Sequence, residues 1–500
     1  MSIGGAEIPA CADPGADPRR LFRTVVPPIV LPVFLAAADS TIVATALPEI
    51  GAALGHVELL SWVVVVNLIA STVAAPAYGR LADLFGRRRL MLIALAVFTA
   101  AALFSAASRS LWLLLAARVV QGLGGGGLMT LSQALIGEYV PARARGQYQG
   151  YVATCIVAGS ALGPVAGGLL TQAGGWPAVF LAYVPFSVAA MLLVMRLPRD
   201  KVSRGPASFD ALGAVLLTGF VVPLLVAVAR FQRLDAATLP LTLALAGAAA
   251  MMLWLLLVQQ RGQAAGILSL PLLRHPAFWR ADVMAAGSGA SLTAMVTFLP
   301  LYLLVVTQAT PAEAGLLLMP LTVSVSSGSV LTGWLVSRTG HTAIFPAVGL
   351  TITAASLIAL AIFGPGLSRP ALSALLAIGG LCQGSAMLTA QLAVQTVASP
   401  RQLGSAAASV QLARSLGSAF GAALAGAVLF GVLSAIDGDA ARLFLELVRH
   451  GPDVLAALPP VRQAVVHAEI ADAFRAVFLT VACFSTMIVA AAWTTPVRRL

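Results

Sequence analysis

The chain has 500 residues, of which 59% are hydrophobic and only 10% charged, and its formal net charge is +11. Soluble globular domains carry about a quarter charged residues, so this composition excludes an ordinary soluble domain and favours a protein that lies in lipid. The positive charge alone would also fit a nucleic-acid partner, and the distribution of the basic residues decides between the two.

Apolar runs long enough to span a membrane recur along the whole chain, since a spanning helix needs about 20 mostly apolar residues. They predict an all-α polytopic membrane protein with fourteen transmembrane helices. The runs cover 25–48, 60–79, 90–107, 110–136, 150–171, 178–195, 210–229, 239–258, 282–306, 314–336, 344–364, 370–396, 404–434 and 474–494. The first run contains Asp39 and is too long for the core of a cleavable signal, whereas 90–107 and 178–195 are short for a span.

The basic residues alternate with this topology. If the N-terminus is cytoplasmic, most Lys and Arg residues fall in inside segments, with Arg87, Arg88 and Arg89 as the densest group. The bias follows the positive-inside rule and predicts a multi-pass protein of the cytoplasmic (inner) membrane with both termini in the cytoplasm. We therefore expect membrane lipid around the chain and no nucleic-acid partner.

A weak internal repeat divides the chain. GRLADLFGR at 79–87 aligns with GWLVSRTGH at 333–341, and Gln121-Gly122 aligns with Gln383-Gly384. The repeat predicts two equivalent six-helix bundles, at 1–204 and 263–500, with two inserted helices and a linker at 205–262. Paired bundles of this kind usually rock around a site near the bilayer midplane. The range 435–473 is expected to be an outside loop; a short amphipathic helix or a contact with a periplasmic accessory protein are the alternatives to a plain connector.

Few ionisable residues lie deep in the predicted helices, and such residues are costly in lipid. Asp39 is the one deep carboxylate, and Arg118 and Arg414 are the deep bases. Asp39 and Arg118 lie roughly 13 and 12 Å from the outer ends of their helices, so their depths are similar. Direct pairing remains open, and a structural ion pair is the alternative to a functional role. Glu138 and Asp282, near helix ends, are expected to be solvated.

Small residues mark two helices. In 110–136 a polar and small stripe shares one face and predicts either a cavity lining or close helix packing. In 150–171 glycines recur at four-residue steps and favour tight packing, and Pro164 is expected to kink the helix. The stripe comprises Arg118, Gln121, Gly122, Gly125, Met129 and Ser132, and the glycine series comprises Gly159, Gly163 and Gly167.

Together these strings resemble the major facilitator superfamily, and within it the 14-helix drug:proton antiporter family. The resemblance spans nearly the whole chain and rests on four motifs: ADSTIVATALP at 38–48; Gly79, Leu81, Asp83, Gly86, Arg87 and Arg88; Arg118, Gln121 and Gly122; and Gly159, Gly163, Pro164, Gly167 and Gly168. It implies the major facilitator fold and a multidrug efflux transporter involved in antibiotic resistance, not an enzyme, with the proton as coupling ion and no cofactor.

The resemblance also implies roles. Gly79, Arg80, Asp83, Gly86, Arg87 and Arg88 would form a conformational latch between the halves. Asp83 would contact the N-terminal end of a helix in the second half, where backbone dipoles favour an anion. Arg80 and Arg87 would hold the loop. Ser337 stands at the position of Asp83 in the second copy, so the latch should be asymmetric. Arg118 would take part in proton transfer, with Asp39 as the candidate proton carrier.

The cargo is expected to be a small amphipathic molecule. Candidate cavity residues are Trp62, Asn67, Gln121, Met129, Met295, Phe298, Tyr302, Gln391 and Gln395, each of which is also compatible with ordinary packing. No acidic residue occurs from 314 to 436, which favours monovalent cationic or neutral cargo. Lys201 lies outside any phosphate-binding Gly-x-x-x-x-Gly-Lys string, and neither the histidines nor the cysteines form a metal motif. Export of a native lipid or metabolite, or import, on the same fold remain alternatives.

Overall fold

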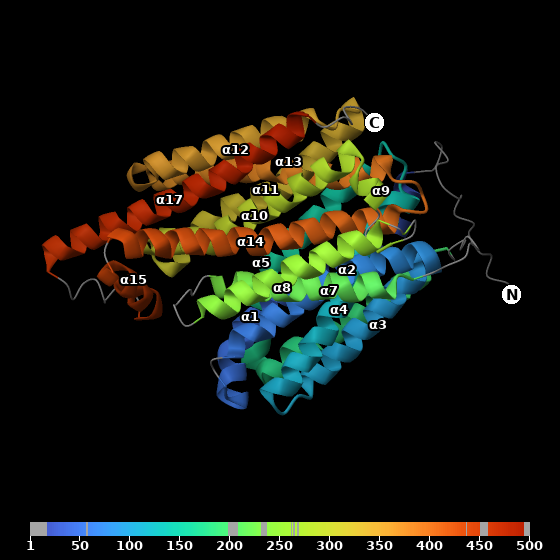
Figure 1. Cartoon of the computed structure of the whole chain (residues 1–500), viewed down its shortest axis with the longest axis horizontal. Helices are drawn as coiled ribbons and strands as arrows, with labels where there is room; N and C mark the ends of the chain where they lie inside the picture. The colour runs from blue at the N-terminus through green and yellow to red at the C-terminus, as the bar shows by residue number, and fades with distance from the viewer. Residues whose placement is uncertain are drawn as a thin grey trace.

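The computed structural model describes residues 18–56, 59–198, 209–231, 238–261, 263, 266–267, 270–436, 438–450 and 459–494, and within these ranges it is helical with no β-strand (Figure 1). The predicted domain boundaries at 204–205 and 262, and Cys11, lie outside these ranges. Cys155, Cys382 and Cys483 are free thiols.

The first half consists of six helices. Their bounds are α1 Pro18–Leu54, α2 Leu60–Phe85, α3 Arg87–Ala106, α4 Leu111–Tyr139, α5 Arg145–Leu181 and α6 Tyr183–Met195. Gly86, with φ of 95°, makes the sharp turn between α2 and α3, a backbone conformation that favours glycine. Ser110 caps α4 by accepting a hydrogen bond from Leu113 N at 3.3 Å.

The remaining helices form an inserted pair and the second half. The pair is α7 Ala211–Phe231 and α8 Leu239–Gln260, followed by the short α9 Leu270–Leu273. The second half contains α10 Pro276–Val305, α11 Pro311–Thr339, α12 Ile344–Phe363, the 3-10 turn η2 Gly364–Gly366, α13 Arg369–Val397, α14 Leu403–Ile436, α15 Gly438–His450 and α17 Pro460–Trp493. A capping box of Thr310 and Glu313 starts α11, and the left-handed Gly340 ends it.

Thirteen helices among the described residues are long and apolar enough to cross a membrane, with Arg145–Met195 counted as one. Within that stretch the backbone leaves helical geometry at Gly174 and Gly175, where φ is −146° and 71°. The break separates the two predicted runs 150–171 and 178–195, which accounts for the predicted fourteen. The break lies at the two glycines, whereas Pro164 lies inside the helix and the kink expected there stays a prediction.

The range 435–473 differs from the expected loop. Helix α14 continues to Ile436, α15 occupies Gly438–His450, and α17 begins at Pro460, well before the apolar run at 474. Ala440, Phe444 and Leu447 lie on one face of α15 and are buried, so this helix is the amphipathic alternative. A hydrophobicity criterion finds only the part of a helix that faces lipid, and it therefore missed the polar extensions.

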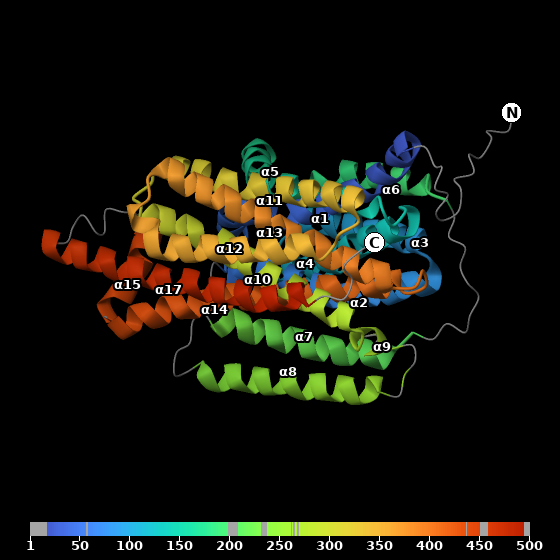
Figure 2. The same cartoon turned by 90° about the horizontal axis from the view of Figure 1, so that it is seen from above.

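The inserted helices lie at the side of the molecule (Figure 2). Helix α7 packs against α2 of the first half and α14 of the second, and α8 lies on its outer side. The halves also touch each other directly through α2 with α14, α4 with α14, and α5 with α11. Helix α7 therefore covers one seam between the two bundles.

Glycines bring α5 against α1. A methyl group added at Gly163 would overlap the Thr41 hydroxyl, and one at Gly167 would lie 2.6 Å from Ile42 O. At Gly159 it would lie 3.0 Å from Phe34 O, whereas at Gly168 it would meet nothing within 4 Å. The first three glycines therefore permit the close helix approach that the sequence predicted, and Gly168 does not contribute to it.

Candidate functional site

Helices α1, α2 and α4 bring polar side chains to one point inside the first half. Arg118 Nη1 lies 2.8 Å from Asp39 Oδ1 and 3.0 Å from Oδ2. Gln121 Nε2 donates to Oδ1 at 3.0 Å, and Asn67 Nδ2 donates to Oδ2 at 3.0 Å. The structure therefore pairs Asp39 with Arg118 directly, which the sequence left open, and adds two amide donors. We call Asp39, Asn67, Arg118 and Gln121 the ion-pair cluster.

The ion-pair cluster is shielded from solvent. Asp39 is 2% exposed and Arg118 0%. Arg118 also donates from Nε to Val63 O at 3.1 Å, while its Nη2 is buried with no partner in the described part of the chain. Removing one member of a buried ion pair costs about 3–5 kcal/mol, because the other charge is left uncompensated. A proton gained by Asp39 would therefore weaken contacts that join three helices.

Tyr183 on α6 belongs to the same region and was not found from the sequence. Tyr183 is 2% exposed and lies close enough to Asp39 and Arg118 for their charges to act on it, but its hydroxyl has no hydrogen-bond partner among the described residues. The ring of Phe180 lies 6.0 Å from the Arg118 guanidinium carbon. The sequence shows only that a tyrosine lies inside an apolar run, and this pattern does not indicate which helix the tyrosine side chain faces.

The predicted latch crosses between the halves. Asp83 Oδ1 accepts a hydrogen bond from Gly404 N at 2.8 Å, and Oδ2 accepts from Ser405 N and Oγ at 2.9 and 2.8 Å. Because α14 begins at Leu403, the carboxylate caps free backbone amides at a helix N-terminus. Gly79 allows the close approach, since a methyl group there would lie 2.6 Å from Gly404 O.

The contacts of the latch arginines differ from those expected from the sequence. Arg87 contacts Asp83 at 3.2 Å, Glu138 Oε2 at 2.7 Å and Pro400 O at 2.7 Å. Glu138 is thus an ion-pair partner and not a solvated helix end. Arg80 Nε is buried without a hydrogen-bond partner among the described residues, so Arg80 does not hold the loop as expected.

Arg88 holds a different helix. Its guanidinium donates to Val194 O at 3.3 Å and Met195 O at 2.6 Å at the end of α6. In the second copy of the motif, Ser337 donates only within its own helix, to Trp334 O at 2.7 Å. The latch contacts are therefore asymmetric between the halves, as predicted.

A second set of contacts closes the same end of the molecule. Arg145 donates to Gly137 O at 2.7 Å and, across the seam, to Gln395 O at 2.9 Å. Gln395 Nε2 donates back to Gln133 O at 2.8 Å. Gly146 and Gly333 pack backbone to backbone nearby. The two bundles are therefore closed at the end that carries the latch.

The other predicted cavity residues do not gather in one place. Phe298 and Tyr302 are buried in the core of the second half, where Tyr302 packs edge-on against Phe478 at 5.1 Å. Met295 lines a pocket in that half. Trp62 and Met129 are partly buried, and Gln391 is buried with both amide atoms unpaired in the described residues.

Two further charged residues lie in the second half. Asp282 accepts a hydrogen bond from Ser409 Oγ at 2.5 Å and is part-buried, not solvated as expected. Arg414 packs against Gly289 of α10, where a methyl group added to the glycine would lie 2.6 Å from Arg414 O.

Two helical bundles that meet at one end, with an ion pair buried inside one of them, define a polytopic transport protein of the two-bundle type. The family model of the Major Facilitator Superfamily matches residues 29–422, and the chain belongs to this superfamily. The members of this superfamily that are named below are transporters, not enzymes.

Curated relatives agree with this assignment. An MFS-type transporter of Mycobacterium tuberculosis (strain ATCC 25618 / H37Rv) is 31% identical over 417 residues, which are 82% of this chain and 60% of that protein. The multidrug transporter protein MdtP of Bacillus subtilis (strain 168) is 28% identical over 80% of this chain and 74% of its own length. The efflux pump dotC of Dothistroma septosporum (strain NZE10 / CBS 128990) is 29% identical over 83% and 72%. The chain thus spans about three fifths of the length of the mycobacterial relative.

Solved structures share the fold. The human organic anion transporter MFSD10 superposes with a TM-score of 0.63 at 16% identity, covering 95% of this chain and all of that one. The proton:xylose symporter XylE, bound to 6-bromo-6-deoxy-D-glucose, gives 0.63 at 14% identity, covering 96% and 98%.

Proposed function

We propose that the chain is a proton-coupled antiporter that exports amphipathic drugs across the cytoplasmic membrane. The observation that carries the proposal is the buried Asp39–Arg118 pair, because a protein rarely keeps a carboxylate this deep in lipid without a functional need. The names of MdtP and dotC as a multidrug transporter and an efflux pump support the direction and the kind of cargo.

The proposed mechanism is competition for Asp39. In the state open to the outside, Asp39 takes up a proton, which weakens its bonds to Arg118, Gln121 and Asn67 and releases the substrate. The protonated carrier turns inward and loses the proton to the cytoplasm. The ionised carboxylate can then favour the binding of the next substrate.

The proposed orientation places the latch in the cytoplasm together with both termini. The positive-inside bias supports this orientation. The contacts of Asp83 and Arg145 then close the cytoplasmic end, and the conformation described above is the outward-facing one. The cap on α14 must break each time the transporter turns inward.

We propose monovalent cationic or neutral cargo. Asp39 is the single deep carboxylate of the first half, and α11, α12, α13 and α14 carry no acidic residue beyond Glu313 at the start of α11. Export of a native lipid or metabolite, or import, would use the same fold, and a periplasmic accessory protein would be an additional partner.

Transport into inverted membrane vesicles tests the proposal. Vesicles energised by respiration should take up ethidium and consume ΔpH, and a protonophore should abolish both. Asp39→Asn should lose uphill uptake. Glu313→Gln is the matched control, because it removes an exposed carboxylate that pairs with Arg369 at 2.5 Å. Uphill ethidium uptake by Asp39→Asn would contradict the proposed coupling, and no uptake by the unmodified protein would favour a lipid or metabolite substrate.

A further inference from the structure

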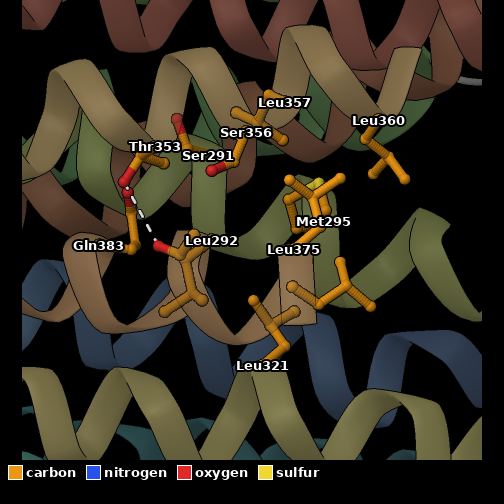
Figure 3. Close-up of a pocket in the computed structure, with 12 residues that line it drawn as sticks. Ser291, Leu292, Met295, Leu321, Thr353, Ser356, Leu357, Leu360, Leu375 and Gln383 are labelled. Atoms are coloured by element: carbon orange, nitrogen blue, oxygen red, sulfur yellow. Dashed lines mark hydrogen bonds between the residues drawn. The ribbon is translucent and has the colours of Figure 1, made fainter. Parts of the chain in front are cut away.

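A pocket lies inside the second half, between α10, α11, α12 and α13 (Figure 3). It holds roughly 420 Å³ of space that protein atoms do not fill, including the open space at its mouth. Its polar lining residues are Ser291, Thr353, Ser356 and Gln383. This pocket has no role in the proton-coupling scheme above.

The internal repeat relates this pocket to the ion-pair cluster. Gln383 corresponds to Gln121, so the position of Arg118 is taken by Gly380. The same offset that aligns Gly79 with Gly333 aligns Asn67 with Leu321, which is another lining residue of the pocket. The second half therefore keeps the glutamine of the cluster and carries Gly380 in place of the arginine. The pocket occupies the corresponding region of the second half.

Gln383 presents an unused acceptor. Its side chain is 5% exposed, and its Nε2 donates to Ser288 O at 2.9 Å and to Ser288 Oγ at 3.3 Å. A carbonyl oxygen can only accept, so this contact fixes which end of the amide faces Ser288. The other end, Oε1, is buried with no hydrogen-bond partner in the described part of the protein. A buried acceptor without a partner is unfavourable, and a donor on a bound molecule would offset that cost.

The remainder of the pocket is apolar and uncharged. Figure 3 shows Gln383 and Thr353 at one end and Leu360, Met295 and Leu375 at the other. None of its lining residues is ionisable. Binding pockets for small molecules are typically mostly apolar, with a few placed polar groups, and the lining of this pocket has that composition.

We propose that this pocket binds an uncharged aromatic or aliphatic group that carries an N–H or O–H donor directed at Gln383 Oε1. We assign the pocket to the apolar part of the exported molecule, and this assignment rests on the proposed function. The charged part of a cationic substrate would remain outside the pocket, because nothing in the lining compensates a charge.

Indole and 1-methylindole form a matched pair of probes, since they differ in the N–H donor. Titration calorimetry on the purified full chain in detergent should show about tenfold tighter binding of indole, the difference expected for one hydrogen bond. Gln383→Leu should abolish that preference. Equal affinities of the unmodified protein for the two probes would overturn the assignment of Gln383.

Gly379→Leu tests the pocket while leaving Gln383 intact. A methyl group at Gly379 would lie 3.4 Å from Ser356 Cβ, an ordinary contact, so the larger side chain can project into the pocket. This variant should lose binding of both probes, whereas Gly247→Leu, at an exposed glycine of α8 with nothing within 4 Å, should keep it. Unchanged indole binding by Gly379→Leu, or no indole binding by the unmodified protein, would refute the proposed ligand site. The pocket would then be only a gap in the packing of the helices.

The vesicle assay separates this inference from the proposed function. Gly379→Leu should take up less ethidium than Gly247→Leu at the same ΔpH. Indole binding without any ethidium export would remove the proposed function and keep the pocket as a ligand site. Full ethidium export by Gly379→Leu would show that the pocket does not serve transport.

Discussion

The latch allows a quantitative prediction for Asp83→Asn. The side chain of Asp83 is 1% exposed and accepts three hydrogen bonds from Gly404 and Ser405 in addition to its contact with Arg87. Asparagine keeps one acceptor oxygen and loses the charge. Hydrogen bonds to a charged group contribute about 1.5–3 kcal/mol each, and a charge at a helix end up to about 2 kcal/mol. We expect the closed latch to lose about 2–4 kcal/mol, which changes the ratio of closed to open molecules about 30- to 700-fold.

Spin-label distances measure this shift. Arg143→Cys on the first half and Arg401→Cys on the second are exposed positions at the latch end, and a background without the native cysteines leaves two labels per molecule. Asp83→Asn should add a population at longer distance. Ser337→Ala is the matched control, because Ser337 occupies the corresponding place in the second copy and bonds only to its own helix. An unchanged distance distribution in Asp83→Asn would refute the latch energetics.

Two further predictions concern stability. Gly163→Val should lower the unfolding temperature in detergent, because overpacking against Thr41 costs about 1–3 kcal/mol, whereas Gly168→Val should not; equal unfolding temperatures would contradict the packing of α5 on α1. Burial raises the pKa of Asp210, but four hydrogen bonds from backbone and side-chain amides outweigh it and hold the pKa below its usual range. The stabilisation is therefore present above pH about 4 and is lost as the pH falls through the lowered pKa. Between pH 6 and pH 3 the unmodified protein should lose more thermal stability than Asp210→Asn, and an equal loss would refute this.

Hydrophobic runs and charge spacing predicted most of the fold. They also predicted the similar depth of Asp39 and Arg118, because position along a helix follows from residue number alone. The rotation of each helix about its axis depends on packing with its neighbours, so neither Asn67 as a partner of Asp39 nor Tyr183 as a neighbour could be found from the sequence. Helix extensions outside lipid were missed for a different reason. The apolar face of α15 is buried against protein and its other face is polar, so the helix contains no long apolar run.

The latch shows the same limit. The motif predicted the contact of Asp83 with a helix N-terminus, and the structure contains it. The motif did not separate Arg80 from Arg87, since both are arginines in one loop region and only the folded arrangement places Glu138 and Pro400 O beside Arg87.

The central claim is that proton and substrate compete at Asp39, and proton release tests it most directly. Ethidium is added to the purified, unbuffered protein, and the change in pH is recorded at a series of starting pH values. The account predicts that ethidium binding releases protons from the unmodified protein and from Glu313→Gln, and releases none from Asp39→Asn. Undiminished proton release by Asp39→Asn, with ethidium still bound, would contradict it.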